Sequence, residues 1–231
     1  IFPPFPDRSE FDLFACMKPA KEVGGDFYDF FLIDDDHLAL VIADVSGKGV
    51  PAALFMVIAK TLIKDRTLAG GTPAEILEFV NERLCENNSM EMFVTVWLGI
   101  LTISTGELIA ANAGHEYPIL RSPDGTFSIL KDAHSMPIAT LDGLSYSKKQ
   151  YRLLLEKGSG LFLYTDGCPE AVNEQNEPFG TSRLLQVLND HSEASVEELP
   201  ALVNASVRDF CRKALQFDDI TLLYLKYKGA E

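Results

Sequence analysis

The sequence has few cysteines, and their arrangement suits neither a metal knuckle nor a disulfide framework. The four cysteines, Cys16, Cys85, Cys168 and Cys211, are widely spaced, and no two form a C-x-x-C pair. This spacing indicates neither a zinc knuckle nor a disulfide scaffold. Reduced thiols, as the cytoplasm maintains them, are therefore the expectation.

Long apolar runs and basic residues are also scarce. No run approaches the ~20 residues of a membrane-spanning helix, and the chain does not start with a basic segment followed by an apolar one. The 34 acidic residues outnumber the 20 basic ones, and the net charge of -14 repels nucleic acid and anionic membranes. We therefore expect a cytoplasmic domain with no nucleic-acid partner and no membrane contact of its own.

The length and composition fit one large domain. The chain has 231 residues and is 47% hydrophobic, which provides enough burial without disulfide or metal staples. The opening stretch IFPPFPDRSE is rich in proline and apolar residues. We interpret residues 1–10 as the end of a linker from an upstream domain and residues 11–228 as the domain itself.

Strand patterns alternate with two blocks of helix. Strands are predicted over 11–20, 27–44 (a hairpin with its turn at 34–36), 92–103, 106–114, 117–122, 126–130, 151–155, 160–166 and 218–227. Helices are predicted over 50–68, 73–86, 183–188 and 199–213, and Thr72 and Glu75 form a capping box before the second. The four strands between 92 and 130 are predicted to form one antiparallel meander. The pattern favours an α+β fold of packed sheets covered by helices.

The stretch LALVIADVSGKGVPAALFM, residues 38–56, resembles a phosphate-binding loop at first sight. A Walker-type loop fails because Ile42 occupies the position of its first glycine. A nucleophile elbow centred on Ser46 fails because Asp44 and Lys48 stand where glycines are needed. What remains is a carboxylate, Asp44, at the end of an apolar strand.

Other aspartates also lie where apolar strands meet polar loops. Asp166 ends LFLYTD, Asp218 precedes ITLLYL, and Asp26 follows the glycines of EVGG. If the strands bearing Asp166 and Asp218 are antiparallel neighbours, the two side chains meet at one sheet edge. Any single aspartate would also fit a turn or cap, but several together repel unless a divalent cation neutralises them. Oxygen ligands without a His or Cys cluster favour Mg2+ or Mn2+.

These residues carry a resemblance to a known family. The blocks EVGGDFYDF, ADVSGKGVPAALFM, NAGHEYP, LYTDG and FDDITLL, in this order, resemble the metal-dependent PPM family of serine/threonine protein phosphatases. The similarity is to its bacterial SpoIIE-like and RsbU-like branch and runs from about Phe11 to Leu225. It implies a four-layer α-β-β-α sandwich, with two antiparallel sheets flanked by helices, and a centre of two Mn2+ or Mg2+ ions.

The resemblance also implies roles for individual residues. Asp44 matches the aspartate that bridges both metals, and the backbone carbonyl of Val45 matches a carbonyl ligand. Asp166 and Asp218 match the other carboxylates of the first metal, and Asp26 matches an acid on the side of the second. Catalysis would then depend on Asp44 and Asp166 with metal-activated water. The neighbour of Asp218, Asp219, is expected to support the site rather than bind metal.

The sequence departs from the animal branch of the family at two points. Ser46 stands where that branch has a histidine proposed as general acid, and the phosphate-binding arginine near the N-terminus has no clear counterpart. Lys48 could face the phosphate or only be solvated. In NAGHEYP, Asn112 and His115 are interpreted as structural, because a histidine at a strand–turn junction is usually hydrogen-bonded in place.

The implied function is hydrolysis of a phosphoserine or phosphothreonine on a regulatory protein. The resemblance implies that the partner is a phosphorylated anti-anti-sigma protein of the STAS type. It also implies that an upstream sensor domain controls the enzyme. Whether the enzyme forms a homodimer is left open. Control would act through the helices 50–68 and 73–86, which adjoin the Asp44 loop. Two alternatives stay open: an inactive phosphatase-like signalling module, and a hydrolase of small phosphoesters.

Overall fold

The computed structural model describes residues 5–6, 8–86 and 88–230, which fold into two five-stranded antiparallel sheets. The strands are β1 (Phe11–Lys18), β2 (Phe27–Leu32), β3 (His37–Val45), β4 (Val94–Thr102), β5 (Glu107–Ala113), β6 (Ile119–Arg121), β7 (Phe127–Ile129), β8 (Tyr151–Leu154), β9 (Gly160–Tyr164) and β10 (Ile220–Tyr227). One sheet has the order β1-β10-β9-β6-β7, and the other has the order β2-β3-β4-β5-β8. The predicted hairpin is confirmed as β2 and β3.

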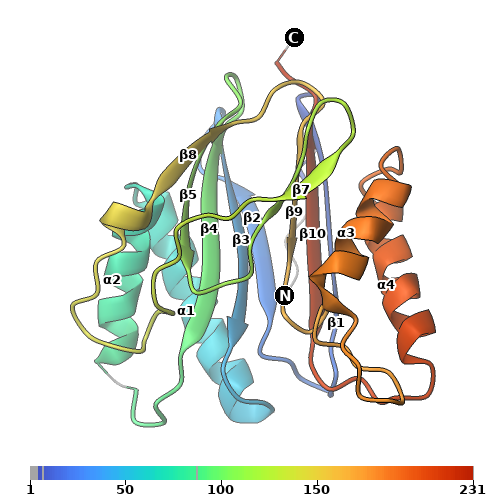
Figure 1. Ribbon diagram of the computed structural model, residues 1–231. Helices are drawn as coiled ribbons and strands as arrows, with labels where there is room; N and C mark the ends of the chain where they lie inside the picture. The colour runs from blue at the N-terminus through green and yellow to red at the C-terminus, as the bar shows by residue number, and fades with distance from the viewer. Residues whose placement is uncertain (1–4, 7, 87, 231) are drawn as a thin grey trace.

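Helices cover the outer face of each sheet (Figure 1). They are α1 (Val50–Leu68), α2 (Pro73–Cys85), α3 (Gly180–Asp190) and α4 (Glu198–Cys211), with a short 3-10 helix η1 (Ser147–Lys149). The first pair packs on β3 and β5, and the second pair packs on β7 and β10. Three apolar layers result: one between the sheets and one under each helix pair. The predicted four-layer α-β-β-α sandwich is confirmed.

Helix boundaries follow the local sequence signals, with small corrections. Thr72 caps α2, and the predicted capping box with Glu75 is present. The helix predicted at 183–188 is longer and starts at Gly180, and α4 starts at Glu198. Pro200 lies in the first turn of α4, where backbone N–H groups lack helical partners in any case, so the proline is tolerated.

The predicted meander between residues 92 and 130 is wrong as a single sheet. β4 pairs with β5 in one sheet, whereas β6 pairs with β7 and β9 in the other. The chain crosses between the sheets after β5, where Gly114 has a φ of 72° and lies so close to Pro137 that a Cβ would meet its ring at 2.8 Å. Alternating apolar residues predict a strand but do not specify the sheet it joins, because both sheets face the same core.

The chain before β1 contacts the domain. Phe5 stacks on Phe14 with ring centroids 5.5 Å apart and lies 5.1 Å from the ring of Phe30. Arg8 forms an ion pair with Glu10 at 2.9 Å. The remaining residues of the predicted linker, 1–4 and 7, lie outside the described residues. Within the described ranges, no helix has the length and apolar character needed to cross a membrane.

Candidate metal centre

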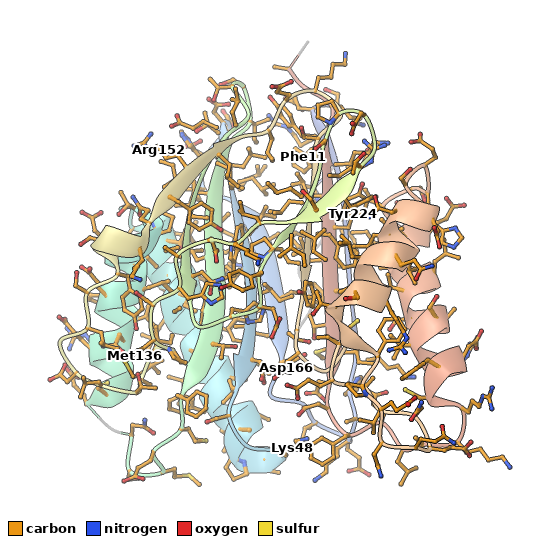
Figure 2. The ribbon with its side chains drawn as sticks, in the orientation of Figure 1. Phe11, Lys48, Met136, Arg152, Asp166 and Tyr224 are labelled. Carbon is orange, nitrogen blue, oxygen red and sulfur yellow. The ribbon has the colours of Figure 1, made fainter. Side chains whose placement is uncertain are left out.

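Strand pairing brings the predicted acids to one end of the sandwich. In the β2–β3 hairpin Phe27 pairs with Ala43, so Asp26 and Asp44 lie opposite each other one residue further on. In the other sheet the end of β9 lies beside the start of β10, which places Asp166 near Asp218. The strand β10 begins at Ile220 rather than at Asp218, so this acid belongs to the preceding loop. Figure 2 shows Asp166 and Lys48 at this same end of the sandwich.

Asp26 connects the two sheets. Its side chain is buried, and its Oδ2 accepts hydrogen bonds from the hydroxyls of Thr165 at 2.7 Å and Thr221 at 2.6 Å. Both threonines lie in the opposite sheet or directly after one of its strands. Burial and the charge of Asp44 raise the pKa of Asp26 well above its usual value, and the two hydroxyls offset part of this rise.

Neighbouring charges perturb the other acids in the same direction. Burial, followed by the charge of Asp166, raises the pKa of Asp44 to about 7, and a hydrogen bond with Asp26 offsets part of the rise. Burial also raises the pKa of Asp166, with further contributions from Glu170 and Asp218. These carboxylates are therefore held together against their mutual repulsion, and a bound cation would relieve it.

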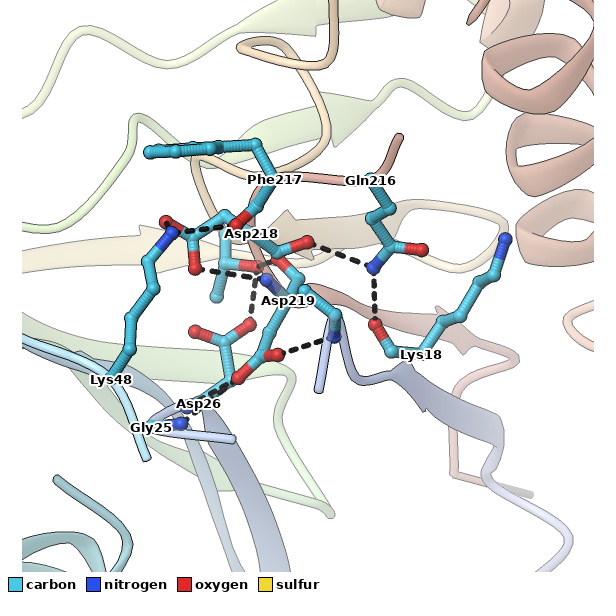
Figure 3. Close-up of polar contacts among 10 residues, drawn as sticks. Lys18, Gly25, Asp26, Lys48, Gln216, Phe217, Asp218 and Asp219 are labelled. Atoms are coloured by element: carbon cyan, nitrogen blue, oxygen red, sulfur yellow. Dashed lines mark hydrogen bonds and ion pairs between the residues drawn. The ribbon is translucent and has the colours of Figure 1, made fainter. Parts of the chain in front are cut away.

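Asp219 performs a structural task, as expected from its position beside Asp218. Its Oδ1 accepts the backbone N–H of Ala20 at 2.8 Å, and its Oδ2 accepts those of Gly25 at 2.9 Å and Asp26 at 3.4 Å (Figure 3). A Cβ on Gly24 would lie 2.1 Å from Asp219 Oδ2, so only glycine allows this close approach. The carboxylate thereby fixes the loop that carries Asp26.

Lys48 is partly exposed, and its ammonium has partners in the loop that carries Asp218. Its Nζ lies 2.8 Å from Oδ2 of Asp218, donates to the carbonyl of Phe217 at 2.6 Å and sits 3.6 Å above the Phe217 ring (Figure 3). Lys48 thus supplies a positive charge to Asp218 in this structure. The sequence-based alternatives of a solvated or phosphate-facing lysine did not include this contact.

His115 is buried and neutral, in agreement with its structural interpretation. Its Nδ1 hydrogen-bonds the hydroxyl of Thr95 at 2.9 Å, and its backbone N–H donates to Oδ1 of Asn112 at 2.7 Å. Burial lowers the pKa of His115 to about 3. The lowered pKa favours a neutral imidazole at neutral pH and a structural role over that of a general acid.

Sequence reasoning missed four residues around the centre. Thr165 and Thr221 hold Asp26, and Glu116 and Glu170 add negative charge beside Asp166. Burial and the charge of Asp166 raise the pKa of Glu116. Their place in the sequence could have identified them. Thr165, Thr221 and Glu116 lie inside the motif blocks, and Glu170 lies just after one of them.

The donor set suits a hard divalent cation in its chemistry. It consists of carboxylate oxygens and the carbonyl of Val45, which Gly25 approaches so closely that a Cβ there would lie 2.8 Å from it. As the side chains stand, no group of three or more His, Cys, Asp or Glu among residues 5–6, 8–86 and 88–230 is placed to hold a metal ion. In this arrangement the carboxylate of Asp218 contacts Lys48. The residues fit the ions in type and charge.

Two five-stranded antiparallel sheets between two helix pairs, with carboxylates gathered where both sheets end, define a phosphatase domain of the PP2C, or PPM, class. The chain belongs to the SpoIIE family, because residues 34–228 match the family described as Stage II sporulation protein E. Asp26 precedes the matched span, so its place at the centre rests on the structure.

Relatives and solved structures agree with this assignment. The chain is 33% identical over 251 residues to Protein IcfG of Synechocystis and 30% identical over 227 residues to the phosphoserine phosphatase RsbU of Bacillus subtilis. These alignments cover 94% and 96% of this chain but only 38% and 65% of the two relatives. The SiaA-PP2C domain of Pseudomonas aeruginosa matches with a TM-score of 0.82 and 26% identity, over 93% of this chain and 85% of that one.

Proposed function

We propose that this domain is a Mn2+- or Mg2+-dependent protein phosphatase that hydrolyses phosphoserine or phosphothreonine. The observation that carries the proposal is the group of buried, mutually repelling carboxylates at the end of a SpoIIE-family sandwich. A pseudoenzyme has no reason to retain such a cluster, since it destabilises the metal-free protein.

Within this proposal, Asp44 would contribute a carboxylate to both of two ion sites. Asp26 and the carbonyl of Val45 would contribute to one site, and Asp166 and Asp218 would contribute to the other. Ions held by these residues would supply a more acidic bound water and positive charge for a phosphoryl group. They would also make an acidic protein compatible with an anionic substrate, because the positive charge comes from the ions.

The chain's own residues prepare the centre. Thr165 and Thr221 orient Asp26, and Asp219 fixes the backbone of Gly25 beside Val45. The hydroxyl of Ser46 accepts a hydrogen bond from the backbone N–H of Phe93 at 2.9 Å, which links the loop after β3 to the residue before β4. No cysteine or serine nucleophile is required by this chemistry.

We further propose that the substrate is a small folded phosphoprotein of the STAS type. The support is the similarity to RsbU, which is named a phosphoserine phosphatase. Because the chain spans 38% and 65% of IcfG and RsbU, control by an additional sensor domain and dimerisation belong to the same proposal. Specificity would come from docking of the partner protein rather than from a closed pocket.

The test is phosphate release from a STAS-type protein carrying phosphoserine and from p-nitrophenyl phosphate, with Mn2+ and with EDTA. Mn2+-dependent turnover of both supports the proposal. Mn2+ binding without turnover of either would identify an inactive signalling module. Turnover of p-nitrophenyl phosphate and nucleotides without any release from phosphoproteins would identify a small-phosphoester hydrolase.

A further inference from the structure

A groove opens beside the candidate metal centre. It lies between α4, the loop 212–218 and the segment after β9, and its cavity volume is about 190 Å³. Gly167 and Asp218 form the part of its wall that adjoins the centre. Anything bound along the groove would therefore continue directly from the position of a phosphoryl group held by these acids.

The loop on one side of the groove exposes large apolar side chains. Leu215 is 90% exposed and Phe217 is 77% exposed, the highest values among the large hydrophobic residues that the structure describes. The loop is nevertheless fixed, because Nε2 of Gln216 donates to the carbonyls of Lys18 and Asp218 at 2.8 Å each. Apolar side chains presented on a fixed backbone are typical of a binding surface.

The same groove carries several basic side chains in a protein with a net charge of -14. Lys18, Arg208 and Arg212 line it together with two acids, Glu170 and Asp218, of which Asp218 pairs with Lys48. Arg208 pairs with Asp209 at 3.1 Å. Over the described ranges, neither the ammonium of Lys18 nor the guanidinium of Arg212 has an ion-pair or hydrogen-bond partner in the protein. Two basic groups are thus available for an acidic ligand.

Resting on the function proposed above, we propose that this groove binds the residues that flank the phosphoserine of a protein substrate. An apolar flanking side chain packs against Leu215 and Phe217, and an acidic one lies beside Lys18 and Arg212. Charge complementarity and continuity with Asp218 favour a phosphorylated segment of this composition. In addition to docking of the partner protein, the groove therefore favours apolar and acidic residues around the phosphoserine.

Three synthetic phosphoserine peptides test this preference. They differ only in the two residue types that flank the phosphoserine on both sides, which are Leu and Glu in the first, Ser and Glu in the second, and Leu and Lys in the third. We expect kcat/KM in Mn2+ to be about tenfold higher for the Leu–Glu peptide than for the Ser–Glu peptide, since burial of leucine is worth that factor or more. The kcat/KM of the Leu–Glu peptide should also exceed that of the Leu–Lys peptide by about threefold to tenfold, and this ratio should decrease in high salt.

Surface variants locate the selection on the protein. Leu215→Ser should remove the preference for leucine, and Lys18→Glu should remove the preference for glutamate. For each variant, the measured quantity is the ratio of peptide turnover to p-nitrophenyl phosphate turnover. A general loss of activity leaves this ratio unchanged. The matched controls are Leu141→Ser, at a leucine 58% exposed in another loop, and Lys131→Glu, at an exposed lysine outside the groove. Both controls should keep the wild-type preference.

Equal kcat/KM for the three peptides, in an enzyme that hydrolyses p-nitrophenyl phosphate with Mn2+, would overturn the groove assignment and leave the phosphatase activity standing. No Mn2+-dependent turnover of any substrate would overturn both. A dimer of the wild type that Leu215→Ser converts to a monomer, with unchanged peptide preference, would show that a second copy of the chain occupies the groove and would also overturn the assignment.

Discussion

Replacing Asp219 with alanine should destabilise the protein, although the residue beside it is the proposed metal ligand. The side chain of Asp219 is 6% exposed and accepts the backbone N–H groups of Ala20, Gly25 and Asp26 at 2.8, 2.9 and 3.4 Å. In Asp219→Ala these donors lose their acceptor while they remain in a partly or fully buried loop. Gly24 also loses the group that it closely contacts.

The size of the effect follows from these bonds. Each buried donor left without a partner costs about 1–3 kcal/mol, and the long bond to Asp26 contributes least. Loss of one charge from the acid cluster relieves some repulsion on Asp26 and Asp44 and offsets part of the cost. We expect the free energy of unfolding to fall by about 2–4 kcal/mol, which corresponds to a decrease in Tm of about 5–15 °C for a domain of this size.

Urea unfolding of metal-free protein measures the effect, and Asp218→Ala is the matched control. Asp218 is about one-third exposed, pairs with Lys48 and accepts one backbone N–H at 2.9 Å, so its removal should cost less than about 1 kcal/mol. Asp218→Ala should instead abolish Mn2+-dependent turnover. Equal stability of the two variants would refute the division of labour between these neighbouring acids, as would a larger loss in Asp218→Ala.

Three further predictions concern the acids and the helices. Asp44→Ala and Asp166→Ala should each lower Mn2+-dependent turnover by about 1,000-fold or more, because charge stabilisation at a metal centre is worth several kcal/mol. Without metal, neither variant should melt below the wild type in calorimetry, because each loses a repelling charge. Substantial EDTA-resistant turnover of the wild type would contradict the metal dependence. Because the pKa of Asp44 is raised from 3.8 to about 7, the metal-free protein should be most stable below pH 4 with respect to this group and should lose that stability as the pH rises to 7. Asp44→Asn should flatten this slope in urea titrations at several pH values, and an unchanged slope would count against the perturbed pKa. On α2, polar-to-apolar changes at exposed positions such as Glu82→Leu should raise turnover and Mn2+ affinity if the helix pair controls the Asp44 loop; a panel of such variants with wild-type kinetics would exclude that control.

Much of the fold could be predicted because its signals are local. The helix α1 begins at Val50 and ends at Leu68 as the apolar spacing and the following glycines predict, and the capping box at Thr72 begins α2. Local signals could not predict which strand belongs to which sheet. β5 and β6 are neighbours in sequence but lie in different sheets, since the crossing at Gly114 depends on long-range packing against Pro137.

At the candidate centre, the aspartates could be predicted but their partners could not. Strand-end positions identified Asp44 and Asp166, because antiparallel pairing brings strand ends together. The hydrogen bonds from Thr165 and Thr221 to Asp26 span 139 and 195 residues of sequence. The contact of Lys48 with Asp218 spans a similar distance along the chain. Only the assembled sheets specify such pairs.

The central claim is that buried carboxylates at the end of the sandwich form a metal centre for phosphoserine hydrolysis. The most direct measurement is phosphate release from a STAS-type protein carrying phosphoserine by EDTA-treated enzyme, titrated with Mn2+, for the wild type and Asp166→Ala. The account predicts no release before Mn2+ is added, saturable release with Mn2+ in the wild type and none in the variant. Release that is independent of Mn2+, or equal in the wild type and Asp166→Ala, would contradict it.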